Sequence, residues 1–354
     1  MTNNRQNQKN KEVVWDFWQK MNYVEPDNLT KVIRGAFHED VNWNGPHPIN
    51  HLEGVDALIT GFWQPLLHSF PDIKRHPYIF MGGLSGEEEW VSGVGYLTGT
   101  FVKDWLGIPA TGEKTNIHFG QHYRLVDGKI AEGYVIYDLL AVMRQAGFQV
   151  LPPARGGEGG KVPGPLTRDG ILLTEQDGQA SRKSSDLVKF MGDGLDRYTR
   201  GRDFGNLRSM EQEHYWHPQM QWYGPSCIGN CLSLEEFGDF HQRPWLQGFG
   251  DRGVFVHGGG RRIPGHAEGN YLGAGAWDTA FSHHHGDYLN IPPSEKMMTI
   301  RNFDWWRREG EYLVQNWVPI DMIDLILQMG VDLFDRLRRQ VELRKQGKSW
   351  FGAW

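Results

Sequence analysis

FHEDVNWNGP (residues 37–46) and WHPQMQWYGP (residues 216–225) are two versions of one stretch, and their likeness decides the fold. Histidine, tryptophan, glycine and proline recur in both stretches at a constant offset of 179 residues. After a slip of four residues the matches continue at an offset of 183, where Ile108-Pro109, Arg124, Asp138, Gln145 and Gly147 correspond to Ile291-Pro292, Arg307, Asp321, Gln328 and Gly330. A repeat of this length indicates two copies of one domain, not a solenoid of small units.

The size and charge of the chain agree with this reading and exclude several classes of protein. A length of 354 residues suits two domains, and each copy is long enough to bury a core. The net charge of −6 provides no basic surface for nucleic acid. Two cysteines exclude a disulfide framework. Because residues 1–10 are polar and no apolar run reaches membrane-spanning length, we expect a soluble, cytoplasmic protein without a membrane partner.

Each copy is predicted to place helices first and hairpin-linked strands afterwards. In the first copy, apolar spacing predicts helices over 12–21, 29–37 and 53–68, and strands over 73–80, 88–101, 115–126 and 129–137, with a closing helix over 138–146. Asp127-Gly128 is a hairpin signal between the last two strands. This order predicts an α+β domain with a curved antiparallel sheet.

The expected domain limits follow from a change in composition between the copies. Residues 1–150 form the first copy, and residues 151–180 are rich in glycine and proline, which indicates a linker or an ordered strap. Residues 181–354 form the second copy, which ends in an amphipathic helix over 331–345.

Several motifs resemble those of SnoaL-like polyketide cyclases, a family of the nuclear transport factor 2-like superfamily. In the first copy they are WLGIPATG (105–112), RLVDGKIAE (124–132), Asp138 and QAG (145–147). In the second copy they are HGDYLNIPP (285–293), NWVPID (316–321) and QMG (328–330). The resemblance implies two tandem cone-shaped α+β barrel domains, each with helices that close an apolar pocket. It also implies an aspartate acid/base assisted by a histidine, no metal or organic cofactor, and pairing of domains through their sheets, as an internal pseudo-dimer or a homodimer.

Asp138 and Asp321 occupy the aspartate position of the family in the two copies. Each directly follows an apolar run. A carboxylate in an apolar cavity is desolvated, which raises its pKa and makes it a usable base near neutral pH. The alternative is that each aspartate caps the helix that follows it.

Histidines divide differently between the two copies. His118, His122 and Arg124 share one face of the strand over 115–126, where a histidine reaching the pocket would hold a substrate carbonyl or share a proton with Asp138. The alternative is a solvent-facing pair. The second copy has Arg301 and Trp305 at the two histidine positions and adds Asp304.

The run His283-His284-His285 belongs to the second copy alone. His283 and His285 share a strand face, and His285 is a candidate acid/base partner of Asp321. A metal site would need a further ligand, for which Asp304, Asp321 and His257 are candidates, but no ligand-spacing signature supports one. The alternative is a surface or packing role.

The remaining candidates are substrate-binding residues, with core packing as the alternative for the tryptophans. They are Trp43, Tyr134, Arg124, Trp222, His283, Asp304 and Trp317.

These features of the sequence leave three candidate functions for the protein. The first is a cofactor-independent acid/base enzyme acting on a small apolar carbonyl compound by aldol cyclisation, isomerisation or dehydration. The second is a ligand-binding or dimerisation module without catalysis. The third is a metal-dependent activity at the histidine run.

Overall fold

The computed structural model describes residues 2–201, 206–251 and 259–349, and the chain divides into two compact units. The first unit comprises Met1–Val150, Gly164–Glu175 and Leu333–Trp354, and the second comprises Leu151–Pro163 and Gln176–Asp332. The limits differ from the expected ones, because the linker region is shared between the units and the C-terminal helix joins the first. The fully buried Gln340 explains the second difference, since its amide both donates to the carbonyl of Gln149 (2.7 Å) and accepts from the Gln149 amide (3.2 Å).

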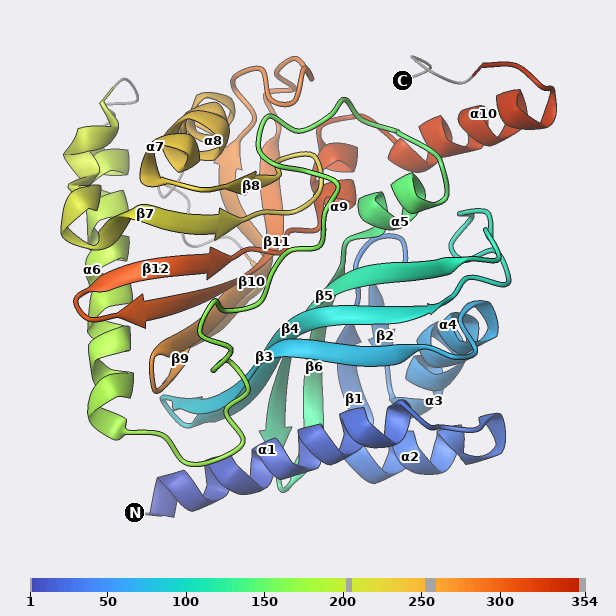
Figure 1. Cartoon of the computed structure of the whole chain (residues 1–354), viewed down its shortest axis with the longest axis horizontal. Helices are drawn as coiled ribbons and strands as arrows, with labels where there is room; N and C mark the ends of the chain where they lie inside the picture. Colours follow the sequence, from blue (N-terminus) through green and yellow to red (C-terminus); the bar gives the residue numbers. More distant parts are fainter. Residues whose placement is uncertain (1, 202–205, 252–258, 350–354) are drawn as a thin grey trace. The chain divides into compact units, whose positions relative to one another are not determined.

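The first unit is built on one six-stranded sheet (Figure 1). Its elements are α1 (Thr2–Met21), α2 (Leu29–Ala36), β1 (Phe37–Asn44), β2 (His51–Glu53), α3 (Val55–Leu58), α4 (Gln64–Ser69), β3 (Lys74–Ser85), β4 (Glu88–Thr100), β5 (Lys114–Val126), β6 (Lys129–Tyr137), α5 (Leu139–Gln145) and α10 (Leu333–Lys345). The strand order is β2-β1-β6-β5-β4-β3, in which β1 is parallel to β6 and the other neighbours are antiparallel. The helices and strands expected in this copy are confirmed, and β1 and β2 are two further strands that the sequence did not predict.

Local sequence determines where β6 and α5 begin and end. Asp127 and Gly128 both take positive φ angles, 47° and 75°, which is the conformation of the tight turn that joins antiparallel strands. Asp138 caps α5 by accepting a hydrogen bond from the amide of Ala141 at 3.0 Å. Gly147 ends that helix with a φ of 86°.

Helix α1 packs against β3 and β4 and defines the inner face of the first sheet. Its Trp18 ring lies 5.1 Å from Phe80 and 5.8 Å from Phe119. Because side chains alternate along a strand, Phe119, Gln121 and Tyr123 of β5 share this face. The even-numbered residues of β5 project from the opposite, outer face.

The second unit repeats the architecture. Its elements are α6 (Gly178–Gly201), β7 (Trp216–Tyr223), β8 (Asn230–Cys231), α7 (Leu234–Glu236), α8 (Arg243–Gly248), β9 (Arg261–Glu268), β10 (Tyr271–His283), β11 (Met297–Glu309), β12 (Tyr312–Trp317) and α9 (Met322–Gln328). The order β8-β7-β12-β11-β10-β9, with β7 parallel to β12, matches the first sheet strand for strand. Helix α6 packs against β9 and β10, as α1 does against β3 and β4.

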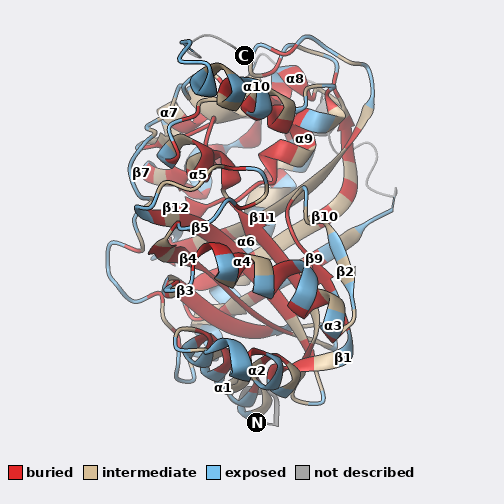
Figure 2. Cartoon of the chain, turned by 90° about the vertical axis from the view of Figure 1, so that its right-hand side faces the viewer, coloured by how far each residue is buried: buried red, intermediate tan, exposed pale blue. Residues whose placement is uncertain are grey.

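The hydrophobic residues are concentrated in the sheets and on the covered sides of the helices. Figure 2 shows the strands largely buried, while helices such as α1 and α2 combine buried and exposed residues. Among the described residues, no helix combines the length and apolar character needed to cross a membrane.

Candidate functional site

The second unit contains a cavity of about 500 Å³ between its helices and the inner face of its sheet. The walls are formed by α6, by the helical segment that follows β8, and by strands β7 and β9 to β12. The lining side chains used below are Met191, Trp222, His241, Trp245, Ala274, Ala276, Asn302, Asp304 and Asn316. Most of the wall is apolar or aromatic, which is typical of sites for small organic ligands.

Small residues on β10 leave the cavity open above β11. Ala274 lies opposite Asp304 in the sheet register, and Ala276 lies opposite Asn302. Neither alanine reaches far from the sheet, so the polar side chains of β11 line free space. Helix α6 contributes Met191 and other aliphatic residues to the far wall.

The corresponding space in the first unit is filled. Gly93 lies opposite Gln121, and a Cβ atom added to Gly93 would come within 2.7 Å of the Trp18 ring. Trp18 therefore occupies the volume that the glycine leaves. Trp18, Gln121 and Phe119 are all fully buried.

Asp304 is the carboxylate of the cavity. One of its oxygens accepts a hydrogen bond from Asn302 Nδ2 at 2.9 Å, and the other accepts from Asn316 Nδ2 at 3.3 Å. The two amides hold the carboxylate in one orientation.

An aromatic wall carries a second titratable group. The His241 ring stacks on Trp222 with centroids 4.1 Å apart and planes 15° apart, and it lies 5.8 Å from the Trp245 ring. Beside it, Gln212 Nε2 donates to Gln242 Oε1 at 2.6 Å. Flat aromatic surfaces next to a few polar groups suit a planar ligand.

The interior of the first unit contains a buried cation instead. Arg75 donates to Gln121 Oε1 at 2.8 Å, and its guanidinium lies 4.6 Å from the Trp18 ring centroid and 4.5 Å from that of Phe119. Burial lowers the pKa of Arg75, while burial raises the pKa of Tyr123 to about 12 despite the opposing charge of Arg75. Arg75 was not predicted from the sequence, since one arginine in a strand gives no signal of its partners.

Of the predicted site residues, Asp304 and Trp222 line the cavity. Trp43 holds the position of Trp222 in the first unit and packs on Phe62, with centroids 4.4 Å apart. Trp317 stacks on Tyr223, and its indole donates to the carbonyl of Pro163 at 2.8 Å. Trp43 and Trp317 are therefore core residues in this structure.

Asp138 and Asp321 both cap helices. Asp321 accepts from the amide of Asp324 at 3.3 Å, as Asp138 does from Ala141, and it also forms an ion pair with Arg301 at 3.3 Å. Because the capping geometry is present in both units, the cap is sufficient to account for the recurrence of the aspartate.

The structure places His118 and His122 on the outer face of their sheet, away from α1, because they alternate with Phe119 and Gln121. The expectation that they reach a pocket under the helices does not fit this placement. His118 Nε2 lies 2.6 Å from the Tyr78 hydroxyl, and burial lowers the pKa of His118 to about 4, against an opposing effect of Asp138. His122 is fully buried.

Two other expected substrate contacts also lie on the outer face. Arg124 forms an ion pair with Glu132 at 2.6 Å, and the Tyr134 hydroxyl donates to the same carboxylate at 2.9 Å.

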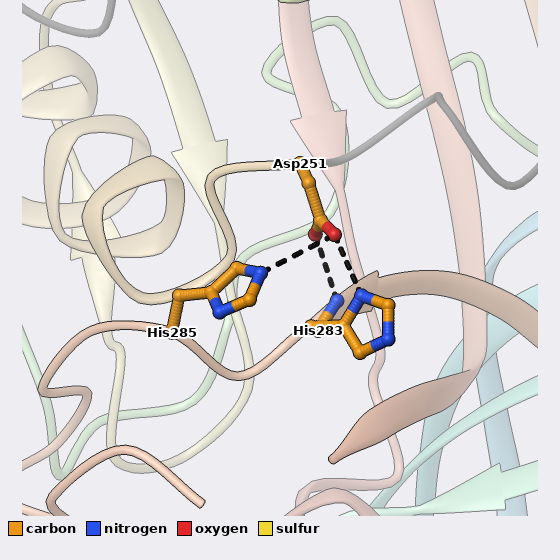
Figure 3. A group of neighbouring side chains, drawn as sticks. All are labelled: Asp251, His283 and His285. Carbon is orange, nitrogen blue, oxygen red and sulfur yellow. Dashed lines mark hydrogen bonds and ion pairs between the residues drawn. The ribbon is translucent and has the colours of Figure 1, made fainter. Parts of the chain in front are cut away.

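The histidine run has other partners than the expected ones. His283 and His285 both contact Asp251 (Figure 3). His285 also pairs with Glu295, and not with the expected Asp321. The sheet ends at His283, so the side chains of His283 and His285 meet through Asp251 and not through a shared strand. His284 is buried and lies 3.2 Å from the Ser294 hydroxyl. His257 lies outside the described residues.

The two sheets, each with one parallel pair and with N-terminal helices over one face, are α+β folds of the nuclear transport factor 2-like class. Residues 14–146, which lie in the first unit, match the family model described as SnoaL-like polyketide cyclase. No curated protein matches the chain.

Several solved structures are similar to part of the chain. A putative SnoaL-like polyketide cyclase from Jannaschia sp. CCS1 is 24% identical, with a TM-score of 0.33, and the match covers 38% of this chain and 89% of that one. IdmH, a putative polyketide cyclase from Streptomyces antibioticus, is 19% identical, with a TM-score of 0.33 and coverage of 39% and 99%. A putative polyketide cyclase from Acidithiobacillus ferrooxidans is 20% identical, with a TM-score of 0.33 and coverage of 39% and 94%.

Proposed function

We propose that the protein is an acid/base enzyme of the cyclase or isomerase type and that its reaction takes place in the cavity of the second unit. The observation that carries this proposal is the position of Asp304, a carboxylate fixed by two amide donors on the wall of a mostly apolar cavity. The SnoaL-like family of the first unit supports small-molecule chemistry of this general type.

In the proposed reaction Asp304 is the general base. An oxygen of the Asp304 carboxylate takes the proton from the carbon next to a substrate carbonyl, and the electrons of that C–H bond form an enolate. In a cyclisation the enolate carbon attacks a second carbonyl of the same molecule, which forms one C–C bond, and the new alkoxide takes the proton back. In an isomerisation the proton returns to another carbon. The step needs no oxidant or reductant.

His241 is the proposed partner of the substrate oxygen. Its stacking on Trp222 fixes the plane of the imidazole at the cavity wall. A ring N–H directed at the oxygen would stabilise the negative charge that develops as the enolate forms. Trp222 and Trp245 then provide flat walls for an aromatic or conjugated substrate.

Hydrogen exchange tests the base without knowledge of the natural substrate. Phenylacetone is incubated with the full-length protein in D₂O, and loss of its α-proton signals is followed by NMR. We expect the wild type to accelerate exchange and Asp304→Asn to slow it by about a hundredfold or more. Asp138→Asn and Asp321→Asn are the controls, because asparagine also caps helices well, and both should keep the wild-type rate.

The same assay separates catalysis from simple binding. Retention of the exchange rate in Asp304→Asn, or its loss in Asp138→Asn with the fold intact, would contradict the proposed base. If the wild type binds the ketone without accelerating exchange, the second unit is a ligand-binding module for such compounds.

A further inference from the structure

Asp251, His283 and His285 of the second unit lie outside the proposed catalytic cavity and bring three metal-binding side chains together (Figure 3). Each offers one ligand atom, and these atoms all lie within 4.8 Å of one another. Asp251 follows α8, His283 ends β10, and His285 lies in the loop after it. All three are half-buried or exposed, so an ion from solution can reach them.

Hydrogen bonds orient the carboxylate of this cluster. Asp251 Oδ1 accepts from the amide of His283 at 2.8 Å and from the hydroxyl of Ser282. Oδ2 is thereby directed at the two imidazoles, 2.7 Å from His283 Nδ1 and 3.4 Å from His285 Nε2.

The hydrogen-bond partner of His285 Nδ1 determines whether the Nε2 atom carries a hydrogen or a lone pair. His285 Nδ1 lies 2.6 Å from the Glu295 carboxylate, which can only accept, so Nδ1 carries a hydrogen. In a neutral imidazole the lone pair is then on Nε2, where it faces another acceptor, Asp251 Oδ2. Two acceptors face each other in this way only when a cation lies between them, either a proton or a metal ion.

The separation of these two atoms fits a shared metal ion better than a hydrogen bond. At 3.4 Å it exceeds the usual N–H···O range of about 2.7–3.2 Å. Two ligands at about 2.0–2.1 Å from a tetrahedral zinc ion lie roughly 3.3 Å apart, so His285 Nε2 and Asp251 Oδ2 already have this spacing. His283 Nδ1 is at hydrogen-bond distance from Asp251 Oδ2 (2.7 Å), so this imidazole would move outward to bind the same ion. A carboxylate that holds the outer nitrogen of a histidine ligand is the usual second layer of such sites.

In the first unit an ion pair occupies the position of the Asp251, His283 and His285 cluster. Asp72, the counterpart of Asp251, accepts from the amide and hydroxyl of Thr100 and forms an ion pair with the ammonium of Lys114. In the sheet registers Thr100 lies opposite Lys114, as His283 lies opposite Met297. Methionine thus replaces the lysine in the second unit, and the aspartate faces two histidines.

We infer that Asp251, His283 and His285 form a binding site for a divalent transition-metal ion such as Zn²⁺, which takes the place of the lysine ammonium of the first unit. Two imidazoles and one carboxylate suit Zn²⁺ and leave a fourth coordination position open to water. Glu295 acts as a positioning residue through His285.

Titration of Zn²⁺ into the untagged full-length protein, followed by calorimetry, tests the site. We expect one site in the wild type, affinity at least about tenfold weaker in His285→Ala, and a loss of about tenfold in Glu295→Gln. His68→Ala, which removes an exposed histidine of the first unit, should leave the affinity unchanged. Visible absorption of bound Co²⁺ gives a second readout that reports histidine ligation directly.

Met297→Lys is the sharpest variant, because it keeps all three ligands and restores the ammonium found in the first unit. It should lower the Zn²⁺ affinity at least about tenfold while the protein stays folded. The inference is overturned if the wild type shows no Zn²⁺ binding and no rise in melting temperature with Zn²⁺, or if His285→Ala binds Zn²⁺ as tightly as the wild type.

Discussion

The interiors of the two units differ although their sheets have the same strand order. In the first unit Trp18 fills the space above Gly93, and Arg75 packs between Trp18 and Phe119. In the second unit the space above Ala274 is part of a cavity that Asp304 lines. The comparison shows that one frame can support a packed core or an open site, depending on a few side chains on the inner face.

The largest expected effect is on the packed interior. Trp18→Ala should lower the free energy of unfolding by about 3–5 kcal/mol, because the ring is fully buried and contacts Phe80, Phe119 and Arg75. Met191→Ala, on the cavity wall of the second unit, should cost much less, since Met191 is only half-buried. Urea unfolding measures both, and equal losses would contradict the difference between the interiors.

Replacement of the two capping aspartates by alanine should also lower the free energy of unfolding by unequal amounts. Asp138→Ala should cost about 1 kcal/mol through the lost cap. Asp321→Ala should cost about 2–3 kcal/mol, because it also removes a buried partner of Arg301, which keeps Asp278 and Asp324. Chemical denaturation of both variants tests the order, and an equal or larger loss in Asp138→Ala would show that the ion pair adds nothing.

Acid should destabilise the first unit through His118. Burial lowers the pKa of His118 to about 4, whereas an unfolded histidine titrates near 6.5. Between these values the unfolded state binds more protons, so stability is complete above pH 6.5 and falls as the pH drops toward 4. At pH 5 the loss from this group is about 2 kcal/mol relative to pH 7.5.

The variant His118→Gln isolates that contribution. Its stability should change less between pH 7.5 and pH 5 than that of the wild type, as measured by urea unfolding at each pH. Part of the dependence should remain, because burial also lowers the pKa of His266 in the second unit to about 4. Equal pH dependence in variant and wild type would contradict a buried neutral His118.

The smallest effect on stability is expected for the exposed ion pair between Lys114 and Asp72 of the first unit. Lys114→Met removes the ion pair with Asp72, which holds the pKa of that carboxyl well below its usual range. Both side chains are largely exposed, so the loss of stability should stay below about 1 kcal/mol. A larger loss of stability, measured by thermal unfolding, would show that the Lys114–Asp72 ion pair supports more of the structure than its own loop.

The repeat and the turn signals predicted much of the fold. The hairpin at Asp127-Gly128 and the helix between Asp138 and Gly147 depend on local backbone conformation, which short stretches of sequence encode well. The strand β1 was not predicted, because its parallel partner β6 lies far along the chain. The grouping of α10 with the first unit depends on Gln340 and Gln149, which no local pattern connects.

The candidate site was predicted only in part. Trp222 and Asp304 were named from the sequence, and both line the cavity. The main error was to expect that His118 and His122 of β5 face the pocket under the helices. Alternation along a strand shows which residues share a face, but not which face the helix covers. His241 and Asp251 were missed because their partners, Trp222 and the histidine run, are brought to them only by tertiary structure.

The most direct test of the account blocks the cavity of the second unit without touching Asp304. Ala276→Leu places a larger side chain opposite Asn302, whereas Ala276→Ser is the control that keeps the space open. Binding of phenylacetone and exchange of its α-protons are measured for both variants and the wild type. We predict that Ala276→Leu loses binding and exchange while Ala276→Ser keeps both; wild-type binding and exchange in a folded Ala276→Leu protein would contradict the assignment of the site to this cavity.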